Sequence, residues 1–245
     1  MTVSRTDHKP RFAPEGLGVP NGQDWRQLTD ELIGGLTFCA DCLGREETVA
    51  NERAQAVAAQ TLLSGVSKGI AQAGNLIERL RQRYADEESE GIEAVTSFSQ
   101  HPLVRLAQTY LNAFEAVGVV SLLVFDMPLP QQMRATAVKC VSLALQAARE
   151  LRRAINLVFA SQGLGTVADS CAHIGRLENQ ADAAFQTALI AIFGQPSGEH
   201  VGQRWTQNEA GTLRLLLALE ALTDRCEEIA EMLLLVEVTG YGVNA

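Results

Sequence analysis

Long segments of good helix formers, separated by a few breaks rich in glycine and proline, restrict this chain to a helical fold. Alanine, leucine, glutamate, glutamine and arginine are abundant, and aromatic residues make up only 5% of the 245 residues. Apolar residues make up 47% and charged residues 20%, as in globular proteins. We therefore expect an all-α protein, long enough for one large core or two small ones.

Apolar periodicity and the positions of the breaks predict two groups of three helices. The break at Asp126-Met127-Pro128 lies near the middle of the chain. We expect a disordered tail over 1–22 and two tandem antiparallel three-helix bundles, over 23–126 and 127–245. The expected helices span Trp25–Gly44, Glu46–Tyr84, His101–Phe125, Pro130–Ser161, Val167–Phe193 and Gln207–Thr239.

Three local features refine these helices. Asp24 is the expected N-cap of the first. The glycines of the second helix are expected to bend or split it, and they are Gly65, Gly69 and Gly74. The valine-rich segment Val117–Phe125 could be a strand on local evidence, but no strand partner lies nearby, so we favour a buried helix. It is also too short to span a bilayer.

Charge and cysteine content indicate where such a chain works. The formal net charge is -9, so its overall field does not attract nucleic acid or anionic lipid, and cations or basic surfaces are the expected partners. Met1–Asn21 has no apolar core of a signal peptide. Five scattered cysteines fit reduced thiols in a cytoplasm. Cys39 and Cys42 form a lone Cys-x-x-Cys, which we interpret as two half-buried helical thiols rather than a zinc or redox site.

Two pairs of acids, four residues apart, are the most informative pattern. Glu178 and Asp182 lie on the fifth expected helix, and Glu220 and Asp224 lie on the sixth. Residues at i and i+4 share a helix face, so each pair presents two carboxylates in one direction. If the two helices fold back around Val201, Glu178 is level with Asp224, and Asp182 is level with Glu220. The four carboxylates are then expected to meet at one level.

The apolar pattern around these acids leaves two interpretations open. Glu178 falls in the middle of an apolar stripe and Asp182 at its edge, while Glu220, Asp224 and Glu227 flank the seam of the sixth helix. One interpretation is a metal site, because a multivalent cation offsets the cost of burying clustered carboxylates, and oxygen ligands suit magnesium, calcium, manganese or iron. The other is a set of solvated acids, or acids paired with arginines, namely Arg176, Arg214 or Arg225.

Two sequence segments resemble a known family. They are IGRLENQADAAFQTALIAIF (Ile174–Phe193) and LEALTDRCEEIAEMLL (Leu219–Leu234). They resemble the closing hairpin of PhoU-like proteins, in particular the subgroup described as putative Pit accessory proteins or phosphate-transport regulators. That hairpin carries an acid followed four residues later by Asp on paired helices, with an Asp-Arg-Cys-Glu stretch in the last helix. The resemblance covers the chain from about Val167 onward.

The resemblance implies a fold of two three-helix bundles, with metal ions, commonly iron or zinc, on acidic motifs. The implied ligands are Glu178, Asp182, Glu220 and Asp224, with Glu227 as a fifth. It also implies a regulatory protein, not an enzyme, that contacts a phosphate transporter or an associated signalling protein at the inner face of the membrane, as a homodimer or larger assembly.

The first half of the chain departs from the family pattern. A second acidic hairpin is expected there, but no clean Glu-x-x-x-Asp is present. Only isolated side chains stand in its place, namely Glu52, Glu78, Asn112 and Glu115. The first site is therefore expected to be degenerate, which leaves a helical scaffold without metal as an alternative function.

Catalytic motifs give little support to an enzyme. The sequence has no Glu-x-x-His pairs of a di-iron enzyme and no P-loop. His173 is expected to point away from the acids. A metal-dependent phosphoesterase that uses the same carboxylates is the second alternative.

Overall fold

A computed structural model describes residues 20–44, 52–89, 98–126, 129, 131–160, 164–193 and 207–239. Within these ranges it contains packed α-helices, one short 3-10 helix and no strand, which confirms the expected all-α class. The α-helices are α1 (Gly22–Gly44), α2 (Glu52–Ser89), α3 (Pro102–Asp126), α4 (Gln131–Phe159), α5 (Leu164–Phe193) and α6 (Gln207–Thr239), and the 3-10 helix η1 spans Phe98–Gln100.

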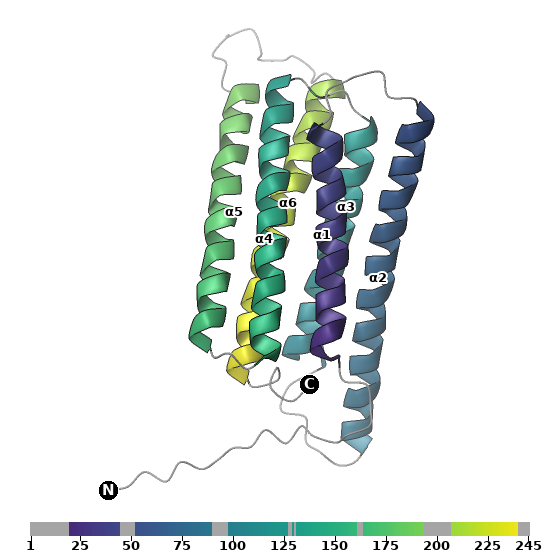
Figure 1. Ribbon diagram of the computed structural model, residues 1–245, viewed down its shortest axis with the longest axis vertical. Coiled ribbons are helices and arrows are strands. Elements are labelled where there is room, and N and C mark those ends of the chain that lie inside the picture. The colour runs from purple at the N-terminus through teal and green to yellow at the C-terminus, as the bar shows by residue number, and fades with distance from the viewer. Residues whose placement is uncertain are drawn as a thin grey trace, which may run out of the picture.

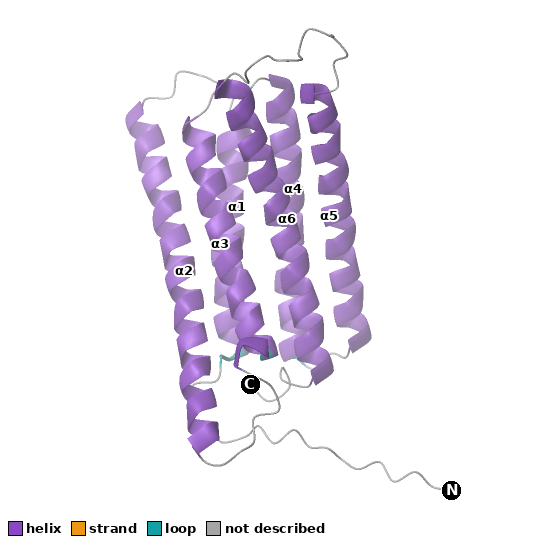
Figure 2. Ribbon diagram, turned by 180° about the vertical axis from the view of Figure 1, so that it is seen from behind, coloured by secondary structure: helices purple, strands orange, loops and turns teal. Residues whose placement is uncertain are grey.

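Consecutive helices run in alternating directions, side by side (Figure 1). Helices α1, α2 and α3 contact one another, and so do α4, α5 and α6. The two groups meet where α1 packs against α4 and α3 against α6. From behind, α2, α3, α6 and α5 form one face of the molecule, with α1 and α4 beyond it (Figure 2). Helix α5 lies at the edge and packs against α4 and α6.

One apolar core runs through both groups of helices. It includes Trp25 of α1, Phe114 of α3 and Ile155 of α4, none of them more than 1% exposed. The hydroxyls of Thr29 and Tyr110 share a hydrogen bond of 2.6 Å inside it, which satisfies two polar groups that would be costly to bury alone.

The first turn of α1 is held by a capping box. The Asn21 side chain accepts hydrogen bonds from the backbone N–H groups of Gln23 (2.9 Å) and Asp24 (3.1 Å). The Asp24 carboxylate in turn accepts one from the backbone N–H of Asn21 at 2.9 Å. The expectation that Asp24 is the N-cap was therefore wrong: Asn21 is the N-cap, and the helix starts at Gly22, earlier than predicted. Asp24 also pairs with Arg79 of α2 at 2.7 Å.

Helix α2 is continuous through all three of its glycines, so the expected split was wrong. At Gly69 an added Cβ would lie 2.2 Å from the Phe114 ring. This glycine allows α3 to approach closely, whereas nothing lies within 4 Å of such an atom at Gly65 or Gly74. Helix α2 also extends to Ser89, into part of the segment expected to be a connection.

Helix α3 includes Val117–Phe125, so the prediction of a helix there was confirmed. Val117 and Val120 are fully buried against neighbouring helices. By length and composition alone, Pro102–Val124 is also the one candidate for a membrane span within the described residues. Val117–Phe125 alone is too short for such a span, but the apolar character continues through the earlier turns of the helix.

The later helix boundaries differ little from expectation. Helix α6 has the expected bounds, α4 ends at Phe159, and α5 starts at Leu164. Gly165 therefore lies inside α5 rather than in a break. The tail up to 19 and the segments 90–97 and 194–206, which include expected connections, lie outside the described residues.

Candidate metal centre

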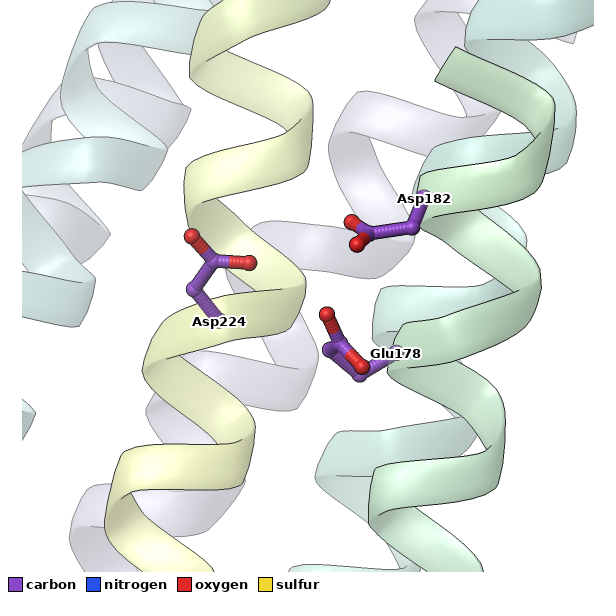
Figure 3. A group of neighbouring side chains, drawn as sticks. All are labelled: Glu178, Asp182 and Asp224. Atoms are coloured by element: carbon purple, nitrogen blue, oxygen red, sulfur yellow. The ribbon is translucent and has the colours of Figure 1, made fainter. Parts of the chain in front are cut away.

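Three carboxylates from α5 and α6 converge between the two helices. Glu178 and Asp182 lie one turn apart on α5, and Asp224 faces them from α6 (Figure 3). One carboxylate oxygen from each residue lies within 4.8 Å of the others, and all three side chains are half-buried. We call these three residues the carboxylate triad. The expected convergence of acids from the two helices is thus present for three of the predicted residues.

The burial pattern of α5 explains the direction of its two acids. Ile174, Ala181, Phe185 and Ala188 are buried, as expected from their spacing. Two further buried residues, Leu177 and Ala184, move the centre of the apolar stripe away from Glu178. Glu178 therefore lies at the edge of the stripe that faces α6, and not in its middle as the sequence suggested.

Asp182 has the least accessible oxygen of the triad. Its Oδ1 atom is buried from water and has no hydrogen-bond partner. A buried carboxylate oxygen without a donor costs on the order of 1–3 kcal/mol. A cation bound at this oxygen would offset that cost.

Crowding of carboxylates shifts the protonation of Glu178. Burial is the first cause that raises the pKa of Glu178 from 4.5 to about 7, and the charges of Asp182, Glu227 and Asp224 contribute to the same shift. The closeness of the Asp182 carboxylate thus favours the protonated form of Glu178.

The pKa values of other acids on α6 are raised as well. Burial is the first cause that raises the pKa of Glu220, and Asp224 and Asp182 add to it. Burial and then Asp182 raise the pKa of Asp224, although Arg225 acts against them. Glu220 lies outside the triad but close enough to feel its charge.

Glu227 lies against the backbone of α5. A Cβ added at Gly175 would lie 2.9 Å from Glu227 Oε1, so the glycine leaves room for this carboxylate. Burial and then Glu231, Asp224 and Asp182 raise the pKa of Glu227. Sequence reasoning missed both Gly175 and Glu231. No local sequence pattern shows how closely Glu227 of α6 approaches α5 at Gly175.

Arg225, one of the arginines that could have neutralised these acids, has another ion-pair partner. Arg225 pairs with Glu228 at 2.5 Å. Among the described residues, no salt bridge reaches any member of the triad, Glu220 or Glu227. The expected alternative of arginine-paired acids is therefore not what the described side chains do.

The remaining candidates from the sequence are placed away from the triad. His173 Nδ1 lies 4.0 Å from Glu150 of α4, on the side of α5 away from α6. Cys39 is fully buried rather than half-buried, and burial raises the pKa of its thiol to about 12. Cys42 is half-buried, as expected, and both thiols are free of disulfides.

The acids of the first half do not form a second cluster among the described residues. Glu115 is exposed on α3. Asn112 accepts a hydrogen bond from Gln108 at 3.2 Å, and Glu78 pairs with Arg81 at 3.1 Å. The side chain of Glu52 lies outside the described part.

The donor set of the triad consists only of carboxylate oxygens, which fits hard cations such as magnesium, calcium, manganese or iron. An ion binds oxygen at about 2.0–2.6 Å, closer than a water molecule approaches. No model of a known protein family and no curated protein matches this chain, so the residues themselves carry the argument about function.

Proposed function

We propose that this chain is an accessory protein of the PhoU-like type, which binds a multivalent cation between α5 and α6 and regulates phosphate transport by protein–protein contact. The proposal extends the resemblance of Ile174–Phe193 and Leu219–Leu234. The helices of each half contact one another, as two three-helix bundles require, but α1 packs more extensively against α4 than against α2 or α3.

The observation that carries the cation proposal is Asp182. Its Oδ1 atom is inaccessible to water and lacks a donor, in a group of three carboxylates without a basic partner among the described residues. Glu178 and Asp224 complete the proposed ligand set, with Glu220 and Glu227 as further oxygen donors next to it. A bound cation supplies positive charge that lowers the repulsion between these acids.

The proposed role is regulatory and not enzymatic. No nucleophile with a positioned base accompanies the triad among the described side chains, and His173 faces Glu150 instead. We propose a cytoplasmic protein, at most peripheral to the membrane, whose partner is a phosphate transporter or an associated signalling protein. Iron, zinc, manganese and magnesium are the candidate ions.

Elemental analysis tests the cation proposal. Wild-type protein, purified without chelator, is expected to carry about one equivalent of a multivalent metal per chain. Asp182→Asn/Asp224→Asn is expected to lower that content at least about tenfold, because carboxylate charge supplies most of the affinity of such sites.

The matched control changes one acid on each helix outside the triad. Asp169 is exposed on α5, and Glu228 is paired with Arg225 on α6. Asp169→Asn/Glu228→Gln is expected to keep the metal content of the wild type. Equal metal content in the triad variant and the wild type would rule out the assigned ligands.

A second candidate function is a helical interaction scaffold without metal. The first half favours it, because Glu115 is isolated and exposed there and Glu78 is paired with Arg81. Metal below about a tenth of an equivalent in wild-type protein, even after incubation with manganese or iron, would favour the scaffold.

A further inference from the structure

Helix α4 carries a charge opposite to that of the chain as a whole. The chain has 20 basic and 29 acidic residues, but α4 contains five arginines and lysines and only one acid, Glu150. The helix lies between α1 and α5 on one face of the molecule (Figure 1). Its exposed positions, among the described side chains, are either basic or uncharged. Positive charge is therefore concentrated on the outer surface of this helix.

The basic side chains of α4 form a line along the helix. Lys139, Gln146 and Arg153 recur every seven residues, which is close to two helical turns, and Arg149 lies one turn before Arg153. All four are exposed. We call Lys139, Arg149 and Arg153 the basic stripe. It extends about 21 Å along the helix axis, and the uncharged Gln146 lies within it.

The single acid of α4 is directed toward α5. The Ser170 hydroxyl donates a hydrogen bond of 2.8 Å to the Glu150 carboxylate, and His173 Nδ1 lies 4.0 Å from it. The Glu150 side chain is only 15% exposed, whereas that of Arg153, which lies 3.4 Å from it, is 65% exposed. Glu150 therefore leaves most of the Arg153 side chain accessible to a partner.

The other two members of the basic stripe have no acidic partner in the described part of the chain. Neither Lys139 nor Arg149 forms a salt bridge there. Arg152, on the side of α4 next to α1, differs from them because it pairs with Asp30 of α1. The stripe therefore presents cations that the packing of the described helices does not use.

Arg176 of α5 extends this positive surface. It lies one turn after His173, which faces Glu150 of α4. Helices α4 and α5 run in opposite directions (Figure 1), so Arg176 lies at about the level of Gln146. Its side chain is exposed and forms no salt bridge with a described residue.

We propose that the basic stripe is a docking surface for an acidic segment of a partner protein. Carboxylates along such a segment would meet the three cations in turn, and each arginine can donate two hydrogen bonds to a carboxylate. The overall charge of the chain led us to expect basic partners. However, salt at 0.1 M screens charges beyond about 10 Å, so a segment in contact with α4 responds mainly to the local charge. The proposal does not depend on the cation site or on phosphate transport.

Acids on both sides of the stripe favour a narrow partner over a membrane. Asp30 of α1 and Asp169 of α5 are exposed, and Asp169 shares a helix face with His173, which faces α4. An anionic bilayer would cover the whole face and meet these acids, whereas a single segment of chain contacts the stripe alone. Nucleic acid is disfavoured too, because no aromatic residue for base stacking occurs between Lys139 and Arg153.

Fluorescence anisotropy with a labelled peptide of glutamates tests the proposal. A peptide of about eight residues spans about 26 Å when extended, enough to cover the stripe. In chelator and at about 50 mM salt, the wild type is expected to bind it with a Kd below about 1 mM. At about 300 mM salt the binding is expected to weaken at least about fivefold. Lys139→Gln/Arg149→Gln/Arg153→Gln is expected to weaken it by at least as much at low salt.

The matched control removes the same amount of charge outside the stripe. Lys68 and Arg81 of α2 and Arg214 of α6 are exposed. Lys68→Gln/Arg81→Gln/Arg214→Gln is expected to change the Kd less than about twofold, and circular dichroism is expected to show both variants folded. An equal loss of binding in the two variants would overturn the proposal. So would a wild type that does not bind the peptide, whether or not it binds phosphatidylserine vesicles or a uridine octanucleotide.

Discussion

A proton on Glu178 relieves part of the repulsion between α5 and α6. The unfolded chain releases this proton near pH 4.5, whereas burial and the neighbouring acids raise the pKa of the folded chain to about 7. Between these values the folded state holds more protons than the unfolded state. Stability due to this group is therefore fully present below about pH 4.5 and is lost as the pH rises through about 7.

The first prediction follows from this difference. Glu178→Gln keeps the shape of the side chain and removes its titration, so it is expected to raise the free energy of unfolding at pH 7.5 by about 1–2 kcal/mol, with solvent screening allowed for. At pH 4 the gain is expected to vanish. Urea unfolding of both proteins in chelator, at pH 4 and pH 7.5, measures the difference.

Glu228→Gln is the control, because the Glu228 carboxylate has an arginine partner at 2.5 Å. It is expected to give no stabilisation at pH 7.5. If Glu178→Gln had the same effect at both pH values, the raised pKa of Glu178 would be contradicted.

The spacing of acids in the sequence was enough to find the triad, but not its most buried atom. An i, i+4 pair identifies the face of a helix, and Glu178, Asp182 and Asp224 were found that way. How closely a second helix approaches that face depends on side chains far away in the sequence. The unpartnered oxygen of Asp182 and the position of Glu227 over Gly175 result from that approach, and no local pattern encodes it.

Within helix α2, two glycines with similar sequence surroundings have different roles. Gly69 lies under the buried ring of Phe114, and Gly74 faces open space. A Cβ at Gly69 has to displace a ring that is packed on all sides, which costs about 1–3 kcal/mol or more. A Cβ at Gly74 meets no neighbouring atom, so the only expected effect of alanine there is its higher helix propensity.

We therefore expect Gly69→Ala to lower the free energy of unfolding by about 1–3 kcal/mol. We expect Gly74→Ala, the matched change in the same helix, to raise it by about 0.5–1 kcal/mol. Denaturant titration followed by circular dichroism measures both. Equal effects of the two substitutions would show that α2 and α3 do not pack closely at Gly69.

Helix existence was more predictable than helix ends. Runs of helix formers located each α-helix, but Asn21 rather than Asp24 caps α1, because the capping box uses an acid in the first turn as well as the cap. The continuity of α2 could not be predicted either. The close contact at Gly69 could not be predicted locally, because its neighbour, Phe114, lies on another helix.

One large apolar core extends through both halves of the molecule, and α1 packs more extensively against α4 than against the helices of its own half. Residues from α1 and α3 belong to the same core as residues from α4 and α6. The second group alone would expose the faces of α4 and α6 that contact α1 and α3. Independent unfolding of the two groups is therefore unfavourable.

We expect a single unfolding transition in which tryptophan fluorescence and helix circular dichroism coincide. Trp25, fully buried in α1, reports on the first group. The chain has two tryptophans, so a Trp205→Phe background leaves Trp25 as the only signal. Two separated transitions would instead show that the groups behave as independent domains.

Helix α5 lies at the edge of the molecule and carries two of the three converging carboxylates. Its detachment exposes less apolar surface than that of an inner helix, and it moves like charges apart. Local opening should therefore be easier at α5 than at α3, and the amide protons of α5 should exchange with solvent faster than those of α3. A cation bound between α5 and α6 would hold the two helices together, so the concentration of that cation would determine how often α5 detaches.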